Sequence, residues 1–153
     1  MILPTQDYRR THVETPDRLH QGLDAFVHGL AGWRRRATVG RSLRKEAEEI
    51  SGMAEKLGHL SERRLRDRLA EMQTHFRRQA AGFEAFLPEA LACMMEAASR
   101  TLGLRPYPVQ IMGALALYRG YLAEMATGEG KSLTACLPAA LAAWTGRPFH
   151  FVT

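Results

Sequence analysis

The sequence has few of the residues that build disulfide-stabilised or metal-stabilised folds. Only 2 of its 153 residues are cysteines, Cys93 and Cys136, and both lie in apolar stretches without metal-ligand spacing. Such low cysteine content excludes a disulfide framework and indicates two reduced core thiols in a cytosolic protein. The 6 histidines are scattered along the chain. None pairs with a carboxylate or a cysteine at ligand spacing, so we assign them no metal site.

Long hydrophobic runs are also missing. The longest apolar run, residues 133–144, contains Pro138 and is too short to span a bilayer. The N-terminus lacks the basic-then-apolar layout of a secretory signal. A hydrophobic content of 46% and a charged content of 24% are typical of a soluble globular protein.

Acidic residues are scarce toward the C-terminus, where residues 133–153 contain neither Asp nor Glu. Residues 1–80 hold 16 Lys/Arg against 11 Asp/Glu, whereas residues 81–153 hold 5 of each. A basic first half suits contact with anionic lipid or nucleic acid, and a solvated charged helix face explains it equally well. The arginine-rich stretch 62–78 carries no aromatic series that could stack bases, which makes a nucleic-acid platform the weaker interpretation.

Apolar residues recur with a period near 3.6 and predict a series of helices. The expected ranges are 17–36, 41–57, 61–78, 88–102, 109–118 and 131–145. We expect Gly40 to separate the first two helices and Ser61 to cap the third. The first helix places Phe26 and Trp33 on one face and ends in three arginines, a pattern typical of a helix lying on an anionic membrane surface. Packing of that face into a core is the alternative.

Residues 126–132 read A-T-G-E-G-K-S and lie between an apolar run and a helical run. This is the layout of a phosphate-binding loop, although Met125 stands where the strict motif has its first glycine. Gly128 and Gly130 allow successive N–H groups to converge on an anion. Lys131 can reach the terminal phosphates and the Ser132 hydroxyl can ligate magnesium. A chance G-K-S in an ordinary turn is the alternative.

Strand-forming residues flank this loop and its helix. Residues 121–123 predict one strand and residues 148–153 a second, with the helix 131–145 between them. A strand, a helix and a second strand begin a parallel sheet. The sequence therefore predicts an α/β fold, in which an N-terminal helical segment precedes the first part of a parallel β-sheet domain.

Two strings resemble the SecA family, the ATPase motors of bacterial preprotein translocation. They are R-P-Y-P-V-Q-I-M-G at 105–113 and A-E-M-A-T-G-E-G-K-S-L-T-A at 123–135. The resemblance covers about residues 41–153, is strongest from 104 onward, and includes methionine at position 125. It implies a RecA-like P-loop NTPase domain with ATP and Mg²⁺ as cofactors. Gln110 matches the family's glutamine that recognises adenine, and Arg105 matches a basic residue that flanks the motif of this glutamine. The residues expected around the phosphates and Mg²⁺ are Thr127, Gly128, Glu129, Gly130, Lys131 and Ser132, the last as the magnesium ligand.

The resulting expectation has three regions. Residues 1–40 form an N-terminal extension with an amphipathic helix, 41–103 a helical segment, and 104–153 the first part of a truncated nucleotide-binding domain. The resemblance implies a protein-conducting membrane channel and preproteins as partners. The amphipathic pattern of residues 17–36, by itself, suggests contact with an anionic membrane surface. The resemblance also implies a cytoplasmic protein at the periphery of the inner membrane.

Two other functions remain open from the sequence. One is a fragment of a helicase-type motor acting on nucleic acid, and the other is a truncated helical interaction module without catalysis. No complete catalytic set lies in the chain, since hydrolysis needs a second carboxylate beside the loop. We therefore expect the 153 residues alone to bind ATP without hydrolysing it.

Overall fold

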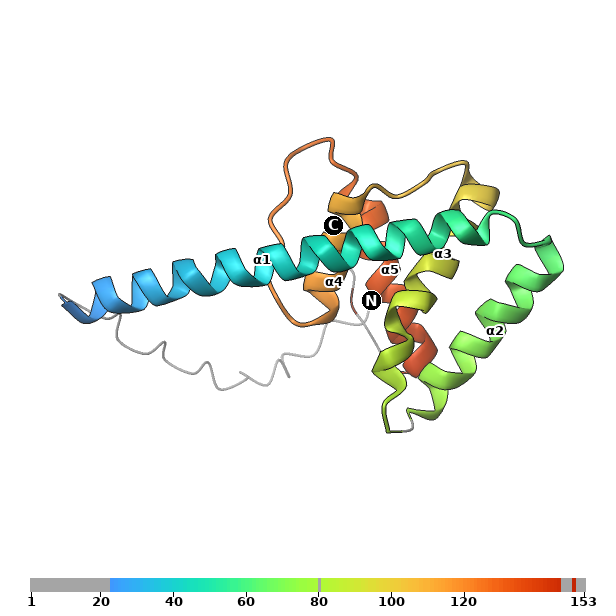
Figure 1. Ribbon diagram of the computed structural model, residues 1–153, viewed down its shortest axis with the longest axis horizontal. Helices are drawn as coiled ribbons and strands as arrows, with labels where there is room; N and C mark the ends of the chain where they lie inside the picture. The colour runs from blue at the N-terminus through green and yellow to red at the C-terminus, as the bar shows by residue number, and fades with distance from the viewer. Residues whose placement is uncertain (1–22, 80, 147–149, 151–153) are drawn as a thin grey trace, which may run out of the picture. The chain divides into compact units, whose positions relative to one another are not determined.

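A computed structural model describes residues 23–79, 81–146 and 150 of the chain. The described residues form five α-helices and one 3₁₀-helix, η1 (Figure 1). Their bounds are α1 Leu23–Leu57, α2 Glu62–Arg78, η1 Phe83–Phe86, α3 Leu87–Leu102, α4 Pro108–Tyr118 and α5 Lys131–Thr145. The chain divides into two compact units, Met1–Ala37 and Thr38–Thr153. All side-chain contacts below belong to the second unit.

Helix α1 runs without interruption through Gly40 (Figure 1), so the predicted break at this glycine is wrong. A glycine inside a helix costs only about 1 kcal/mol relative to alanine. Burial of the helix face that follows offsets this cost, because its residues repeat at helical spacing. The buried residues of this face are Leu43, Ala47, Ile50 and Ala54.

The predicted ends of the other helices are largely confirmed. The Ser61 hydroxyl accepts a hydrogen bond from the Arg64 N–H at 3.4 Å and caps α2, as its side-chain oxygen suggested. Helix α3 carries Pro88 in its first turn and ends at Gly103. Helix α5 continues through Pro138 and ends at Gly146. Local capping chemistry therefore fixes these boundaries.

One hydrophobic core lies between the helices of the second unit. Phe76 of α2 is fully buried and meets the rings of Phe83 in η1 and Trp144 in α5 edge-on, with centroids 5.4 and 6.0 Å away. Such edge-to-face pairs are favourable beyond the area they bury. Close helix pairs are α4 with α5, α2 with α3, and α2 with α5. Phe76 of α2 therefore connects η1 with α5, the helix that follows the glycine-rich loop.

The predicted α/β fold with a parallel sheet is wrong, because the described residues are helical and contain no strand. Residues 121–126 are irregular, and the Tyr121 N–H donates to the Ala116 carbonyl at 2.9 Å instead of to a neighbouring strand. A strand needs an adjacent strand to satisfy its backbone groups, and no described segment pairs with residues 121–126. Most of the second predicted strand, 148–153, lies outside the described residues.

The two cysteines differ in their exposure to solvent. Cys93 is buried and free as predicted, whereas Cys136 is exposed, so its assignment to the core is wrong. Cys136 lies in an apolar stretch, but α5 turns this position outward.

Among the described residues, no helix is long and apolar enough to cross a membrane.

Candidate functional site

The glycine-rich loop forms the entry to α5. Gly128 and Gly130 have φ angles of 89° and 78°, values in the left-handed region that only glycine adopts without strain. Gly130 is the N-cap of α5, and no side chain makes a capping hydrogen bond there. The first N–H groups of a helix are unsatisfied by the helix itself and carry partial positive charge. This end of α5 is therefore suited to an anion.

Lys131 and Ser132 begin α5 and are both exposed. Thr127 is exposed in the turn that precedes Gly128. The structure thus presents an ammonium, a hydroxyl and an uncapped helix start to solvent at one place. Among the described residues, no group of three or more His, Cys, Asp or Glu side chains could hold a metal ion.

Gln110 connects two parts of the site. It is only 7% exposed, its Oε1 accepts from the Tyr107 N–H at 2.9 Å, and its Nε2 donates to the Glu129 carbonyl oxygen at 2.8 Å. A Cβ atom at Gly130 would collide with the Gln110 amide. Gly130 is thus required both by its backbone angle and by the approach of this side chain.

The sequence assigned Gln110 to the recognition of adenine and did not indicate its hydrogen bond to the Glu129 carbonyl oxygen. Its bond to Tyr107 was foreseeable, because a glutamine three residues after an N-cap commonly returns to the cap N–H. Both amide atoms can still make one further hydrogen bond each, since an amide offers two N–H groups and two lone pairs.

Glu129 closes the loop on itself. Its carboxylate accepts a hydrogen bond from the Ala126 N–H at 2.9 Å, and its own N–H donates to the Ala126 carbonyl at 3.4 Å. A carboxylate that accepts from a backbone N–H makes a charge-assisted bond, stronger than a neutral one. Glu129 therefore shapes the loop from within, a role that the sequence did not indicate.

A groove of about 600 Å³ lies next to Gln110. Its volume is in the range of small-molecule sites. Arg105 and Gln110 both line it, whereas the loop residues 126–132 do not. The structure therefore brings together Gln110, which was assigned to the base, and Arg105, which was assigned to the flank of its motif. The residues predicted to surround the phosphates form a second group, joined to the first through the hydrogen bond between Gln110 and Glu129. Sequence reasoning missed the groove's other lining residues, which are Ser51, Glu55, Met95, Gly103, Leu104, Pro106, Tyr107, Pro108 and Leu133.

Comparison with known proteins gives a consistent result. The SecA DEAD-like domain family matches residues 28–153. Protein translocase subunit SecA 2 of Chlorobium chlorochromatii is 44% identical over 153 residues, which cover 99% of this chain and 23% of that protein. Protein translocase subunit SecA 2 of Magnetococcus marinus is 44% identical over 139 residues, 90% of this chain and 21% of that protein. Protein translocase subunit SecA of Neorickettsia sennetsu is 39% identical over 128 residues, 84% of this chain and 16% of that protein. The chain thus spans less than a quarter of the length of these curated relatives.

Proposed function

The chain belongs to the SecA DEAD-like domain family, and on that premise we propose that it binds ATP with Mg²⁺ as the nucleotide-binding part of an ATP-driven protein-translocating motor. The observation that carries the proposal is the uncapped start of α5 behind Gly128 and Gly130, with Lys131 and Ser132 exposed beside it. A helix N-terminus of this kind, entered through a glycine-rich loop, is a common phosphate site.

Each predicted site residue has a proposed role. Lys131 neutralises the terminal phosphates, and Ser132 supplies a hydroxyl ligand to Mg²⁺, which offsets phosphate charge when bound. The N–H groups of Thr127, Gly128 and Gly130 face the phosphates, since the Glu129 N–H donates to the Ala126 carbonyl. Gln110 donates to and accepts from adenine with its remaining amide capacity, and Arg105 contacts the nucleotide from the groove wall.

Lys131→Ala tests the phosphate loop. Titration calorimetry of the 153-residue chain with ATP and Mg²⁺ should show binding that this variant loses. Lys45→Ala is the matched control, because Lys45 is 81% exposed and makes only a surface pair with Glu49. Unchanged ATP affinity in Lys131→Ala would sink the proposal. We expect no ATP turnover by the chain itself, since residues 133–153 contain no carboxylate to complete a magnesium and water site.

The names of the relatives support protein export over a nucleic-acid motor, since each is described as a protein translocase subunit. We therefore propose a membrane channel and preproteins as partners of the motor, with the protein in the cytoplasm at the inner membrane. The segment 17–36 would meet the anionic lipid surface. Flotation with anionic and with neutral vesicles, before and after replacement of Arg34, Arg35 and Arg36 by glutamine, tests that contact. Equal flotation of both proteins with anionic vesicles would contradict it.

A further inference from the structure

The groove beside Gln110 has a wall that comes from α1. Ser51 and Glu55 are one helical turn apart on this helix, and both line the groove together with Arg105 and Gln110. Residues four apart on a helix share a face. A segment distant in sequence from the two motif strings therefore forms part of the same recess.

The polar atoms of this wall can only accept hydrogen bonds. The Ser51 hydroxyl donates its single hydrogen to the Ala47 carbonyl at 2.8 Å, so only its lone pairs remain available. An ionised Glu55 carboxylate has acceptors and no donor. The α1 wall is thus complementary to a ligand that offers N–H or O–H groups.

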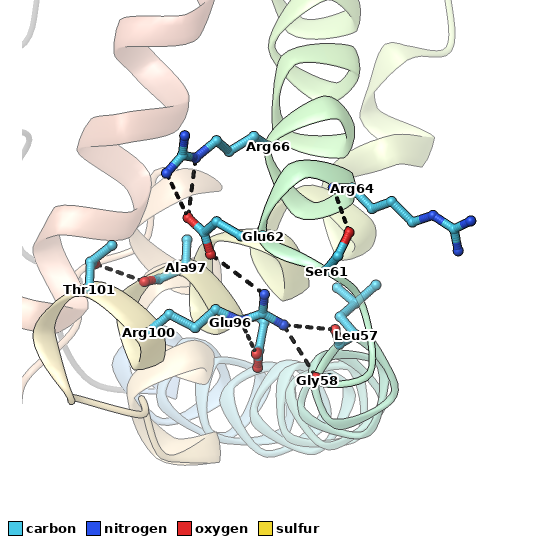
Figure 2. A network of polar contacts seen from close by, with 10 residues as sticks. All are labelled: Leu57, Gly58, Ser61, Glu62, Arg64, Arg66, Glu96, Ala97, Arg100 and Thr101. Carbon is cyan, nitrogen blue, oxygen red and sulfur yellow. Dashed lines mark hydrogen bonds and ion pairs between the residues drawn. The ribbon is translucent and has the colours of Figure 1, made fainter.

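A cluster of polar contacts holds the end of α1 in place. Arg100 of α3 donates to the carbonyls of Leu57 and Gly58, each at 3.3 Å, and pairs with Glu96 at 2.7 Å (Figure 2). The same guanidinium lies 3.7 Å from Glu62 of α2. Arginine can satisfy several partners because its donors are arranged in a rigid, planar fork. The end of α1, just after Glu55, is therefore anchored to α3. The two residues that follow α3, Gly103 and Leu104, also line the groove.

We propose that Ser51 and Glu55 determine nucleoside specificity, with Glu55 accepting a hydrogen bond from a donor of the bound nucleoside. The inference rests on the proposed ATP binding and extends it to a wall outside the motif strings. Two groups of the ligand carry the required chemistry, the exocyclic amine of adenine and the ribose hydroxyls. Either would make the acceptor-only wall selective, because a ligand with a donor facing Glu55 gains a charge-assisted hydrogen bond that a ligand without that donor lacks.

The test compares three nucleotides on three proteins by titration calorimetry. The nucleotides are ATP, purine riboside triphosphate, which carries a hydrogen in place of the amine, and 2′,3′-dideoxy-ATP, which lacks both ribose hydroxyls. The proteins are the unmodified chain, Glu55→Gln and the control Glu48→Gln, whose carboxylate is exposed on α1 and outside the groove. Ser51→Ala adds a second change in the same wall. Circular dichroism and thermal unfolding verify that each variant keeps its fold.

We expect Glu55→Gln to lower ATP affinity about 5-fold, because the amide oxygen still accepts a hydrogen bond but lacks the charge that makes such a bond about twice as strong. If the amine is the donor, the affinity for purine riboside triphosphate changes less than about 2-fold. If a ribose hydroxyl is the donor, dideoxy-ATP is the nucleotide whose affinity hardly changes. Ser51→Ala should act in the same direction with a loss of about 3-fold.

Two results overturn the inference, and they are distinct. Equal changes for all three nucleotides, or none, would show that Glu55 reads no donor, while ATP binding and its dependence on Lys131 would stand. No ATP binding by the unmodified chain would remove the proposed function, and this inference with it.

Discussion

The side-chain amide of Gln110 donates to the Glu129 carbonyl oxygen at 2.8 Å and thereby ties the start of α4 to the glycine-rich loop. The other end of the same amide accepts from the Tyr107 N–H. One side chain thus holds two segments that lie 19 positions apart in sequence. The proposed recognition of a base and the shape of the glycine-rich loop would thus depend on the same residue.

Gln110→Glu should uncouple these segments. The substitution keeps the size of the side chain, but a carboxylate cannot donate to the Glu129 carbonyl and would face it with like partial charge. We expect about 1–3 kcal/mol lower stability and a loss of ATP affinity in calorimetry. Gln110→Ala should in addition remove the preference for ATP over GTP. Gln73→Glu, on the exposed surface of α2, is the control, and an equal effect there would refute this coupling.

Arg100→Met should destabilise the second unit by about 3 kcal/mol, because it leaves the nearly buried Glu96 without its partner. The side chains of Arg100 and Glu96 are 23% and 8% exposed. Arg66→Met removes an exposed pair with Glu62 and should change stability by no more than about 0.5 kcal/mol. Urea unfolding measures both variants. Similar losses would mean that the Arg100 contacts contribute no more than a surface pair.

Gly113→Ala should weaken the packing of α4 on α5. A Cβ atom there would lie 2.8 Å from the Thr134 methyl group, and Thr134 is itself buried. We expect a loss of about 1–3 kcal/mol from overpacking. Gly52→Ala in α1 meets no atom within 4 Å and should instead stabilise the helix, by about 1 kcal/mol at most. Thermal unfolding of the two variants should therefore shift in opposite directions.

The two cysteines should react at different rates. Burial, with a smaller contribution from Glu89, raises the pKa of the Cys93 thiol to about 11, and only the thiolate is nucleophilic. At pH 8, iodoacetamide should therefore modify the exposed Cys136 first, as mass spectrometry of peptides would show. Early modification of Cys93 in the folded chain would contradict its burial.

The same shift predicts a pH dependence of stability. Between the ordinary thiol pKa of 9.0 and about 11, the unfolded chain loses the Cys93 proton while the folded chain keeps it. Stability should therefore be intact below pH 9 and fall as the pH rises through this window. Cys93→Ala should flatten that part of the profile in urea unfolding, and an unaltered slope would count against the shift.

Sequence reasoning succeeded where the cause is local. The hydroxyl of Ser61 and the glycines at 103 and 146 define helix ends through their own backbone and side-chain chemistry, and each is found there. Sequence reasoning failed where the structure of a segment depends on a partner that is distant in sequence. Apolar residues after Gly120 indicated a strand, but a strand exists only beside another, and none of the described segments provides it.

The site shows the same division. The glycines of the loop predicted where α5 begins, because the glycine pattern and the start of the helix are adjacent in the chain. The groove wall at Ser51 and Glu55 could not be predicted, since it arises only when α1 packs near α4. The predicted roles of Gln110, Lys131 and Ser132 remain predictions until nucleotide binding is measured.

Helix α5 is held at both ends, by the loop at Gly130 and by Trp144 against Phe76, with the Gln79 amide donating to the Thr145 carbonyl at 3.0 Å. Pro138 lies midway along α5 and lacks the N–H that would continue the hydrogen-bond ladder of the helix. Any bending of α5 would therefore cost least at Pro138, between the loop at Gly130 and the contact of Trp144 with Phe76.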